Sequence, residues 1–240
     1  MYLHSIELTN ICNLKCEYCV NSKSKYPKGY MTRDNYLTAL GFIGIRAKRL
    51  GISVHGEPLL HPDVCEYVKI AQGYGVNLDL HTNGLLLTES LTKQLIENGL
   101  KGLEVSIHTE EGYNNYKMAY DINEVMGKPL EMVGNVLGII EDKVLDWASK
   151  DKHYPLMIHP KHNWALDEPH PATLCIFIKN ELCVMKWDGT IVACCFDFDG
   201  DTAIGHIKDF AKLVHKPEYK LCSTCSPSWT TNQNSWWRII

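Results

Sequence analysis

The sequence predicts an α/β protein: a partial (β/α) barrel followed by a small cysteine-rich α+β domain. The first half alternates short apolar runs with helical patterns, and this alternation predicts parallel βα units. Six of the ten cysteines lie after residue 174, where the composition changes. A proline-punctuated stretch, Asp167 to Pro171, is typical of a linker. We therefore expect one domain over residues 1–167 and a second over residues 168–240.

The barrel is expected from four apolar strands separated by helices. The strands are predicted at Ser5–Thr9, Ile52–His55, Val76–His81 and Leu103–His108. The helices are predicted at Arg33–Leu50, Pro62–Gly73 and Glu89–Asn98, with Thr32 and Thr88 as N-caps. The strands carry few charges, as is usual where both faces of a parallel sheet are buried. In such barrels the chemistry lies at the C-terminal ends of the strands.

The elements beyond residue 110 follow from weaker patterns. Leu130–Lys143 is predicted as a helix, although Gly134 and Gly138 lie within it. Tyr154–His159 is predicted as a strand. A hairpin is expected around Asp188-Gly189, a dipeptide typical of tight turns between strands.

Composition excludes several classes of function. The net charge of −4 leaves no basic surface of the kind that binds nucleic acid. No stretch of eighteen apolar residues could span a membrane, and the N-terminus does not resemble a signal peptide. In a chain without an export signal, ten cysteines indicate metal or redox ligands rather than disulfides. We therefore expect a cytoplasmic protein with neither nucleic-acid nor membrane partners.

The most informative motif is the run ICNLKCEYC, which places Cys12, Cys16 and Cys19 just after the first predicted strand. Three thiolates can hold a [4Fe–4S] cluster and leave its fourth iron open to a ligand. A zinc site is the main alternative, followed by unrelated core thiols. Zinc favours paired Cys-x2-Cys units and four ligands, and no fourth ligand lies nearby in the sequence.

The cysteine spacing, its position after a strand and the aromatic Tyr18 resemble the signature of the radical S-adenosylmethionine (SAM) enzymes. The resemblance implies that SAM binds the open iron and is reductively cleaved to a 5′-deoxyadenosyl radical. It also implies an electron donor of the flavodoxin or ferredoxin type. The lysines that follow, Lys23, Lys25 and Lys28, are expected in a solvated loop.

Further motifs match the order in which this family places its SAM contacts. Gly56-Glu57 follows the second strand, and the resemblance implies that it holds the methionyl ammonium. A carboxylate opposite an ammonium forms a charge-assisted hydrogen bond. Thr82-Asn83 follows the third strand, near the expected SAM ribose and carboxylate. Both dipeptides belong to tripeptides that commonly form turns, Gly56-Glu57-Pro58 and Thr82-Asn83-Gly84. A purely structural role therefore stays open for each of them.

Two polar residues end the fourth strand. Ser106 and His108 point to the same face because side chains alternate along a strand. The resemblance implies that they reach the SAM ribose or carboxylate. A plain hydrogen-bonded role is the alternative for either residue.

The C-terminal third resembles the SPASM and Twitch extensions of radical SAM enzymes. The resemblance implies that Cys175, Cys194, Cys222 and Cys225 bind one auxiliary [4Fe–4S] cluster. No cysteine follows Cys225, which fits the shorter Twitch form.

Two nearby cysteines compete with these assignments. Cys183 is the alternative ligand to Cys175, and Cys195 is the alternative ligand to Cys194. Neighbouring residues in a strand point in opposite directions, so Cys194 and Cys195 are not expected to be ligands together. A zinc ribbon built from Cys194 or Cys195 with the later pair is the alternative kind of site.

The run HPKHNW, residues 159–164, ends a predicted strand and supplies candidate substrate contacts. His162 and Asn163 are the predicted substrate-binding residues. His162, Lys161 and His159 are the candidate catalytic bases. A capped connection with Trp164 in the core is the alternative.

Three functions remain open on the sequence. The leading one is hydrogen abstraction from a small, carbohydrate-like substrate, followed by oxidation or epimerisation. Epimerisation needs a hydrogen donor, for which Cys183 and Cys195 are candidates. The second is modification of a ribosomally made peptide, although little sequence precedes Cys12 for a leader-binding domain. The third is a non-enzymatic iron–sulfur or zinc protein.

Overall fold

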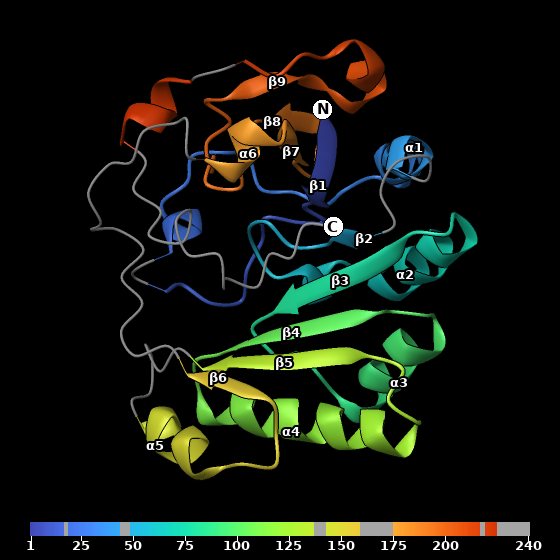
Figure 1. Ribbon diagram of the computed structural model, residues 1–240, viewed down its shortest axis with the longest axis vertical. Coiled ribbons are helices and arrows are strands. Elements are labelled where there is room, and N and C mark those ends of the chain that lie inside the picture. The colour runs from blue at the N-terminus through green and yellow to red at the C-terminus, as the bar shows by residue number, and fades with distance from the viewer. Residues whose placement is uncertain (17–18, 44–48, 137–142, 159–174, 217–218, 225–240) are drawn as a thin grey trace.

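The computed structural model describes residues 1–16, 19–43, 49–136, 143–158, 175–216 and 219–224. Within them the chain forms one nine-stranded sheet of order β6-β5-β4-β3-β2-β1-β7-β8-β9 (Figure 1). The strands are β1 Tyr2–Ile6, β2 Arg49–Gly51, β3 Asn77–Thr82, β4 Gly102–Ile107, β5 Glu131–Val136, β6 Leu156–Ile158, β7 Leu182–Met185, β8 Thr190–Val192 and β9 Ala203–His206. Strands β1 to β6 pair in parallel, as the alternation predicted, and only β8 and β9 add antiparallel pairs.

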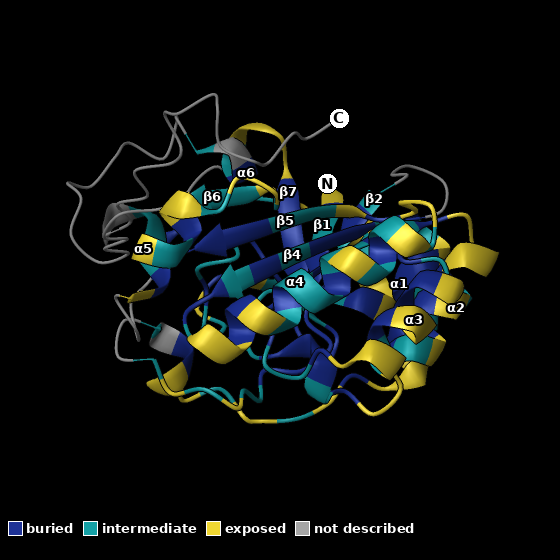
Figure 2. Cartoon of the chain, turned by 90° about the horizontal axis from the view of Figure 1, so that it is seen from below, coloured by how far each residue is buried: buried dark blue, intermediate teal, exposed yellow. Residues whose placement is uncertain are grey.

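Helices follow the strands, and most of them cover one face of the sheet; the last, Ile176–Lys179, instead places Phe177 against His4 and beside Val184 on the opposite face. They are α1 Arg33–Ile43, α2 Val64–Gly73, α3 Glu89–Glu97, α4 Glu110–Val125, α5 Lys143–Lys150 and α6 Ile176–Lys179. Figure 2 shows α1 to α4 along this face, with their exposed residues turned outward. The expected caps are present: Thr88 Oγ1 accepts from Leu91 N at 3.2 Å, and Thr32 Oγ1 accepts from Asn35 N at 3.3 Å.

The two faces of the parallel strands differ in chemistry. The helix-facing positions, such as Leu80 and Val105, are fully buried and apolar. The opposite positions carry His81, Glu104 and Ser106, which are half-buried. The expectation of strands buried on both faces was therefore wrong. The polar residues alternate along β3 and β4, and this alternation marks a second face that is not part of the apolar core.

The predicted helix over Leu130–Lys143 was also wrong, because Glu131–Val136 forms β5. The glycine that weakened the helical pattern has a packing role in this strand. A Cβ on Gly134 would lie 2.7 Å from Leu156 Cδ2 and 3.0 Å from Tyr116 Cε1. Glycine leaves room for the ring of a helix that packs on the strand.

Other boundaries moved by a few residues. Helix α1 ends at Ile43, and the chain from Arg49 to Gly51 is strand β2 rather than the end of a helix. The predicted strand Ile52–His55 therefore follows β2 as a loop. Ile52 is still buried, and its N–H bonds Asp79 O at 2.8 Å.

The C-terminal strands extend the barrel sheet. Strand β7 pairs in parallel with β1, and β8 then forms the predicted hairpin, with Gly189 at φ 92° in its turn. The proposed domain boundary at residues 167–168 lies outside the described residues. A division into two domains therefore stays a prediction.

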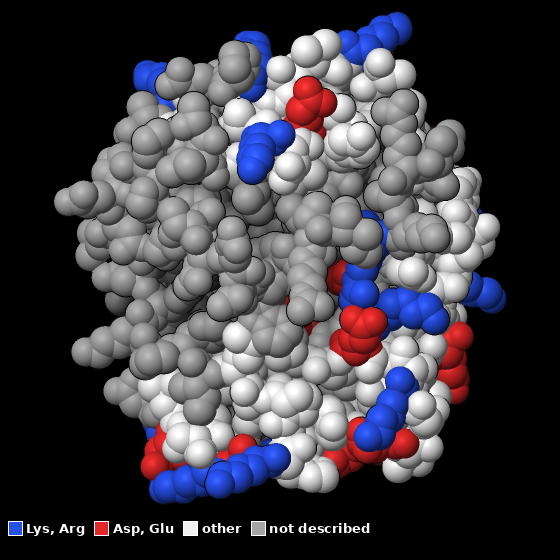
Figure 3. All heavy atoms as spheres, in the orientation of Figure 1, with Lys and Arg blue, Asp and Glu red and all other residues white. Residues whose placement is uncertain are grey.

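Surface charge is mixed on the face drawn in Figure 3. Outside the grey atoms, Lys and Arg side chains alternate with Asp and Glu. Among the described residues, no helix is both long and apolar enough to cross a membrane.

Candidate active site

The loop that follows β1 carries Cys12, Cys16 and Cys19, and hydrogen bonds fix its two ends to each other. Asn21 Nδ2 donates to Asn10 O at 3.0 Å. Lys28 Nζ donates to the same carbonyl at 3.0 Å and to Asn21 Oδ1 at 2.8 Å. Asn10 and Asn21 are buried, so these bonds hold the loop firmly. Lys28 is exposed, as expected for a residue of a solvated loop, and it also connects the two ends of the cysteine loop.

The three thiols are partly exposed, free and close enough to influence one another. Burial raises the pKa of Cys12 and of Cys19, and the neighbouring thiols of the set raise it further. Leu14 N donates to Cys12 Sγ at 3.4 Å, as backbone amides do around bound thiolates. The donor set therefore suits an iron–sulfur cluster.

The geometry does not suit a single metal ion. Within the described part of the chain, no three His, Cys, Asp or Glu side chains converge on one metal position. In a [4Fe–4S] cluster the thiolates bind different iron atoms and need not meet at one point.

The turn after β2 is built against the cysteine loop. Gly56 has φ 74°, and a Cβ there would lie 2.5 Å from Thr9 O and 2.6 Å from Ile11 O. Glu57 N donates to Ile11 O at 2.8 Å. Only glycine allows this close approach of the two backbones. The turn therefore lies beside Cys12.

Glu57 joins the loops of β2 and β3. Its buried carboxylate accepts from Leu59 N at 3.0 Å, Thr82 Oγ1 at 2.7 Å and Asn83 N at 2.8 Å. Burial raises the pKa of Glu57, and these three hydrogen bonds oppose the rise. The structure thus gives Glu57 a positioning role, and a direct contact with SAM stays a prediction.

Asn83 completes the connection to the cysteines. Its Nδ2 donates to Asn13 Oδ1 at 2.8 Å and lies 4.0 Å from Cys12 Sγ. Its Oδ1 accepts from Leu85 N at 3.0 Å. Three loops predicted to share one site are therefore brought together.

The residues at the end of β4 lie at the same edge of the sheet. Ser106 is half-buried and stands opposite Asn135 in the register with β5. His108 is buried, and burial lowers its pKa to about 4, so the ring is neutral near pH 7. A contact of Ser106 or His108 with SAM stays a prediction.

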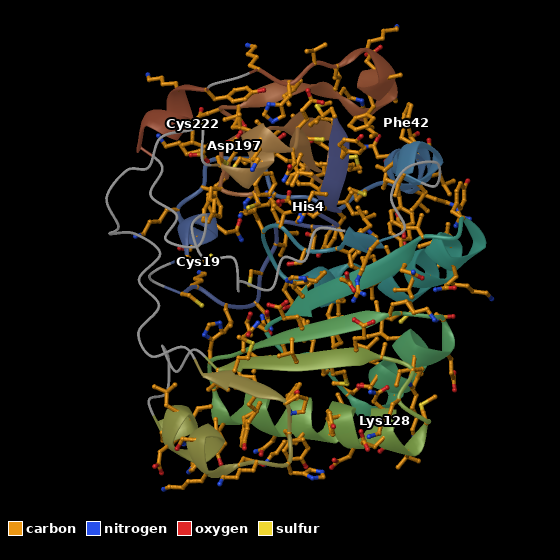
Figure 4. The ribbon with its side chains drawn as sticks, in the orientation of Figure 1. His4, Cys19, Phe42, Lys128, Asp197 and Cys222 are labelled. Carbon is orange, nitrogen blue, oxygen red and sulfur yellow. The ribbon has the colours of Figure 1, made fainter. Side chains whose placement is uncertain are left out.

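The inward face of the sheet holds a polar group that sequence reasoning missed. Glu104 accepts from Asn135 Nδ2, and its Oε2 lies 3.7 Å from His81 Nδ1. His4 lies close enough to His81 that burial and this neighbour together lower its pKa to about 4. Figure 4 shows His4 at the centre of the molecule. The alternation of polar residues in β3 and β4 was the available signal.

The structure gathers three of the four predicted auxiliary ligands. Cys175 precedes α6, Cys194 follows β8, and Cys222 lies in the short helix Lys220–Thr224. Burial raises the pKa of Cys175, and the nearby thiols of Cys194 and Cys222 raise it further. Figure 4 shows Cys222 and Cys19 toward the same side of the molecule.

The two alternative cysteines have different surroundings. Cys183 is fully buried in β7, and its thiol donates to Tyr2 O at 3.3 Å. Burial raises its pKa to about 12, as expected for a core thiol. The thiol of Cys195 is hydrogen-bonded to that of Cys194, and this bond is the main cause that holds the pKa of Cys194 well above its usual range.

Several predicted site residues lie outside the described residues. These are Tyr18, His159, Lys161, His162, Asn163 and Cys225. Their assigned roles therefore stay predictions.

Fold and site together define a partial-barrel iron–sulfur protein with a loop built for three thiolate ligands. Comparison with family models then identifies the family. Residues 6–128 match the radical SAM superfamily, and residues 175–233 match SPASM, an iron–sulfur cluster-binding domain. The chain belongs to the radical SAM superfamily.

Curated relatives share part of the chain. The AdoMet-dependent heme synthase of Methanosarcina barkeri is 35% identical over 114 residues, 46% of this chain and 33% of the relative. The GTP 3′,8-cyclase of Aquifex aeolicus is 32% identical over 165 residues, 60% of this chain and 50% of the relative. The chain thus spans a third to a half of these proteins, and their activities are not transferred to it.

Solved structures share the fold over most of the chain. BtrN in complex with AdoMet and 2-DOIA is similar with TM-score 0.61 and 23% identity, covering 87% of this chain and 80% of BtrN. SuiB of Streptococcus suis bound to S-adenosylmethionine has TM-score 0.56 and 13% identity, covering 86% of this chain and 63% of SuiB. At these identities the likeness shows the fold alone.

Proposed function

We propose that this radical SAM enzyme abstracts a hydrogen atom from a small, polar, carbohydrate-like substrate and completes an oxidation or an epimerisation. SAM bound at the Cys12, Cys16 and Cys19 cluster would supply the 5′-deoxyadenosyl radical. One auxiliary cluster on Cys175, Cys194, Cys222 and Cys225 is part of the proposal. A flavodoxin- or ferredoxin-type protein is the proposed electron donor.

The polar inward face of the sheet carries this proposal. Asn135 Nδ2 donates to Glu104, and Glu104 Oε2 lies 3.7 Å from His81 Nδ1, so three adjacent strands place polar side chains on the face opposite α1 to α4. Such groups match the hydroxyl and amino groups of a sugar or cyclitol better than an apolar substrate. The fold shared with the BtrN complex, which contains 2-DOIA, supports the same class of substrate.

The residues of the chain have distinct tasks in the proposed reaction. Asn10, Asn21 and Lys28 hold the cysteine loop, while Glu57 and Asn83 fix the SAM-motif loops. The carboxylate of Glu104 would orient a substrate hydroxyl or amine. His162 and Asn163 would add contacts from the neighbouring segment, with His159 or Lys161 as a further candidate base.

A peptide substrate is the second candidate, because the structure of SuiB bound to precursor peptide SuiA has a TM-score of 0.52 and covers 85% of this chain. The family membership leaves no support for the third hypothesis, a non-enzymatic iron–sulfur or zinc protein.

The test is an anaerobic assay of the protein reconstituted with iron and sulfide, with SAM and dithionite present. 2-DOIA, a panel of amino sugars and cyclitols, and a panel of peptides are added separately. We expect a sugar or cyclitol to stimulate 5′-deoxyadenosine formation, with deuterium transferred from a deuterated substrate. Stimulation by peptides alone would contradict the proposal.

Glu104→Gln should lower the substrate-stimulated rate at least tenfold, which corresponds to about 1.4 kcal/mol. Slow SAM cleavage without substrate should persist, because the described partners of Glu104 are Asn135 and His81 rather than residues of the cysteine loop. Glu97→Gln on the exposed surface of α3 is the matched control. If Glu104→Gln and Glu97→Gln had equal substrate-stimulated rates, the substrate would not bind at this face of the sheet.

A further inference from the structure

A single stretch, Val54 to Glu57, touches both cysteine-bearing regions. On one side, Glu57 N bonds Ile11 O, the residue before Cys12. On the other side, Val54 packs on the same small apolar cluster as Cys175 and Cys195. Four residues of chain therefore connect the SAM-motif turn with the auxiliary cysteines.

His55 lies at the centre of this connection and is 5% exposed. Its Nδ1 is 2.6 Å from Glu7 Oε2, and its Nε2 is 2.9 Å from the carbonyl oxygen of Cys195. Its ring lies 4.2 Å from that of Phe198, which follows the same cysteines. Both polar partners of His55 are acceptors, so the two bonds are satisfied together when both ring nitrogens donate.

Glu7 is fully buried and anchors the histidine. Its second oxygen accepts from Trp187 N at 3.4 Å, and its own N–H bonds Met185 O at 2.8 Å. A buried carboxyl group requires such partners, and removal of His55 would leave Glu7 Oε2 without this hydrogen bond. The pair therefore ties β1 and the hairpin to the turn after β2.

We propose that His55, oriented by Glu7, is a positioning residue for the auxiliary iron–sulfur cluster. One ring nitrogen bonds the carbonyl of Cys195, the residue after the expected ligand Cys194, and the other bonds the buried carboxyl group of Glu7. The reduction potential of a cluster responds to nearby charge and to hydrogen bonding around its ligands. This inference rests on the proposed auxiliary cluster.

Two substitutions should shift the potential in opposite directions. His55→Phe keeps an aromatic ring but removes the polar ring nitrogens between Glu7 and the carbonyl of Cys195, so the potential should fall. Glu7→Gln keeps the side-chain volume and replaces an acidic group with a neutral amide, so the potential should rise. If His55 and Glu7 acted only through packing, the two substitutions would not shift the reduction potential in opposite directions.

The experiment uses the full chain with Cys12→Ala, Cys16→Ala and Cys19→Ala, so that only auxiliary iron gives a signal. The protein is reconstituted with iron and sulfide, and the reduced cluster is followed by electron paramagnetic resonance during a redox titration. His55→Phe should change the reduction equilibrium at least tenfold, which is 59 mV for a one-electron couple. His55→Gln, which retains a side-chain N–H donor, should recover part of that shift.

His61→Phe is the matched control. His61 is also buried and is bonded to the backbone, with Nε2 3.0 Å from Met31 O and Nδ1 accepting from Asp63 N. The His61→Phe substitution should leave the electron paramagnetic resonance spectrum and the reduction potential of the auxiliary cluster unchanged.

Each outcome decides one point. A folded His55→Phe protein with the parent spectrum and potential would overturn the role of His55. If that variant does not fold, an unchanged potential in Glu7→Gln overturns it instead. A parent protein without auxiliary iron would overturn the auxiliary cluster and, with it, the role of His55.

Discussion

The two cysteine-bearing regions are assembled in different ways. Cys12, Cys16 and Cys19 lie in one loop, and local hydrogen bonds from Asn21 and Lys28 close it. The auxiliary cysteines come from separate segments at residues 175, 194 and 222, with 225 beyond the described residues. The first site depends mainly on local sequence, whereas the second requires the tertiary fold.

The interactions that hold the two cysteine-bearing regions in place also differ. The hairpin beside the auxiliary cysteines depends on buried charges: Lys186 is fully buried and donates to Asp197 O at 3.1 Å and Phe198 O at 3.2 Å. The Asp197 carboxylate accepts from Gly200 N at 2.7 Å and Thr202 N at 2.6 Å. The ends of the first loop are held by the buried amides of Asn10 and Asn21 together with the exposed Lys28. We therefore expect damage at the second site to affect folding as well as metal binding.

The largest expected effect is on the first site. Replacing Cys12, Cys16 and Cys19 together with Ala should abolish reductive SAM cleavage, because a missing ligand set removes the open iron. The auxiliary iron, about four of about eight atoms per chain, should remain. Iron and sulfide assays, together with 5′-deoxyadenosine measured after dithionite reduction, test both parts.

A triple variant that still produces 5′-deoxyadenosine would contradict the assignment of the first site. Loss of all iron in that variant would instead contradict the auxiliary cluster assigned to the second site.

The second-largest expected effect concerns the auxiliary site, whose cysteines come from separate segments of the chain. Cys175→Ala should lose the auxiliary iron and fold poorly, since metal binding contributes to the folding of such a region. Cys183→Ala, in the core of β7, should keep all its iron and lose only about 1 kcal/mol of stability. Iron content and the thermal unfolding midpoint of both variants are the measurements. Full iron in Cys175→Ala with loss in Cys183→Ala would reverse the ligand choice.

The same contrast explains what the sequence could predict. The cysteine loop and the motifs around Glu57 and Asn83 are local, and their order along the strands placed them correctly. The hydrogen bonds of Glu57 to Thr82 and Asn83 could not be read from the sequence, since they join separate loops. The Glu7–His55 pair joins residues 48 positions apart, and no local pattern marks it.

Secondary structure failed where packing overrode local preference. The segment around Gly134 has a helical pattern of apolar residues, but it forms β5 because Tyr116 needs the space a glycine leaves. The group of His81, Glu104 and Asn135 was missed for a different reason. Its residues alternate in strands that we expected to be buried on both faces.

The third prediction concerns how the SAM-motif loops are held. Glu57→Gln should lower the free energy of unfolding by about 1–3 kcal/mol, because an amide N–H₂ would face donors where a carboxylate now accepts. SAM binding, measured by equilibrium dialysis, should weaken with it. Glu66→Gln removes an exposed carboxylate paired with Arg33 and should cost less than about 1 kcal/mol. Equal losses of unfolding free energy in Glu57→Gln and Glu66→Gln would show that the loops after β2 and β3 do not depend on Glu57.

The smallest effect compares buried histidines in the two regions. His55 faces a carboxylate, but His108 has only burial to shift its pKa, which is lowered to about 4. Below pH 6.5 the unfolded chain protonates this ring while the folded chain does not, so stability falls as the pH drops toward 4. From pH 7 to pH 5 this amounts to about 2 kcal/mol. His108→Gln should remove that part of the pH dependence, and His153→Gln, on the exposed surface, should not. Denaturant unfolding at both pH values measures the difference, and a His108 ring resonance that titrates near pH 6.5 would contradict the prediction.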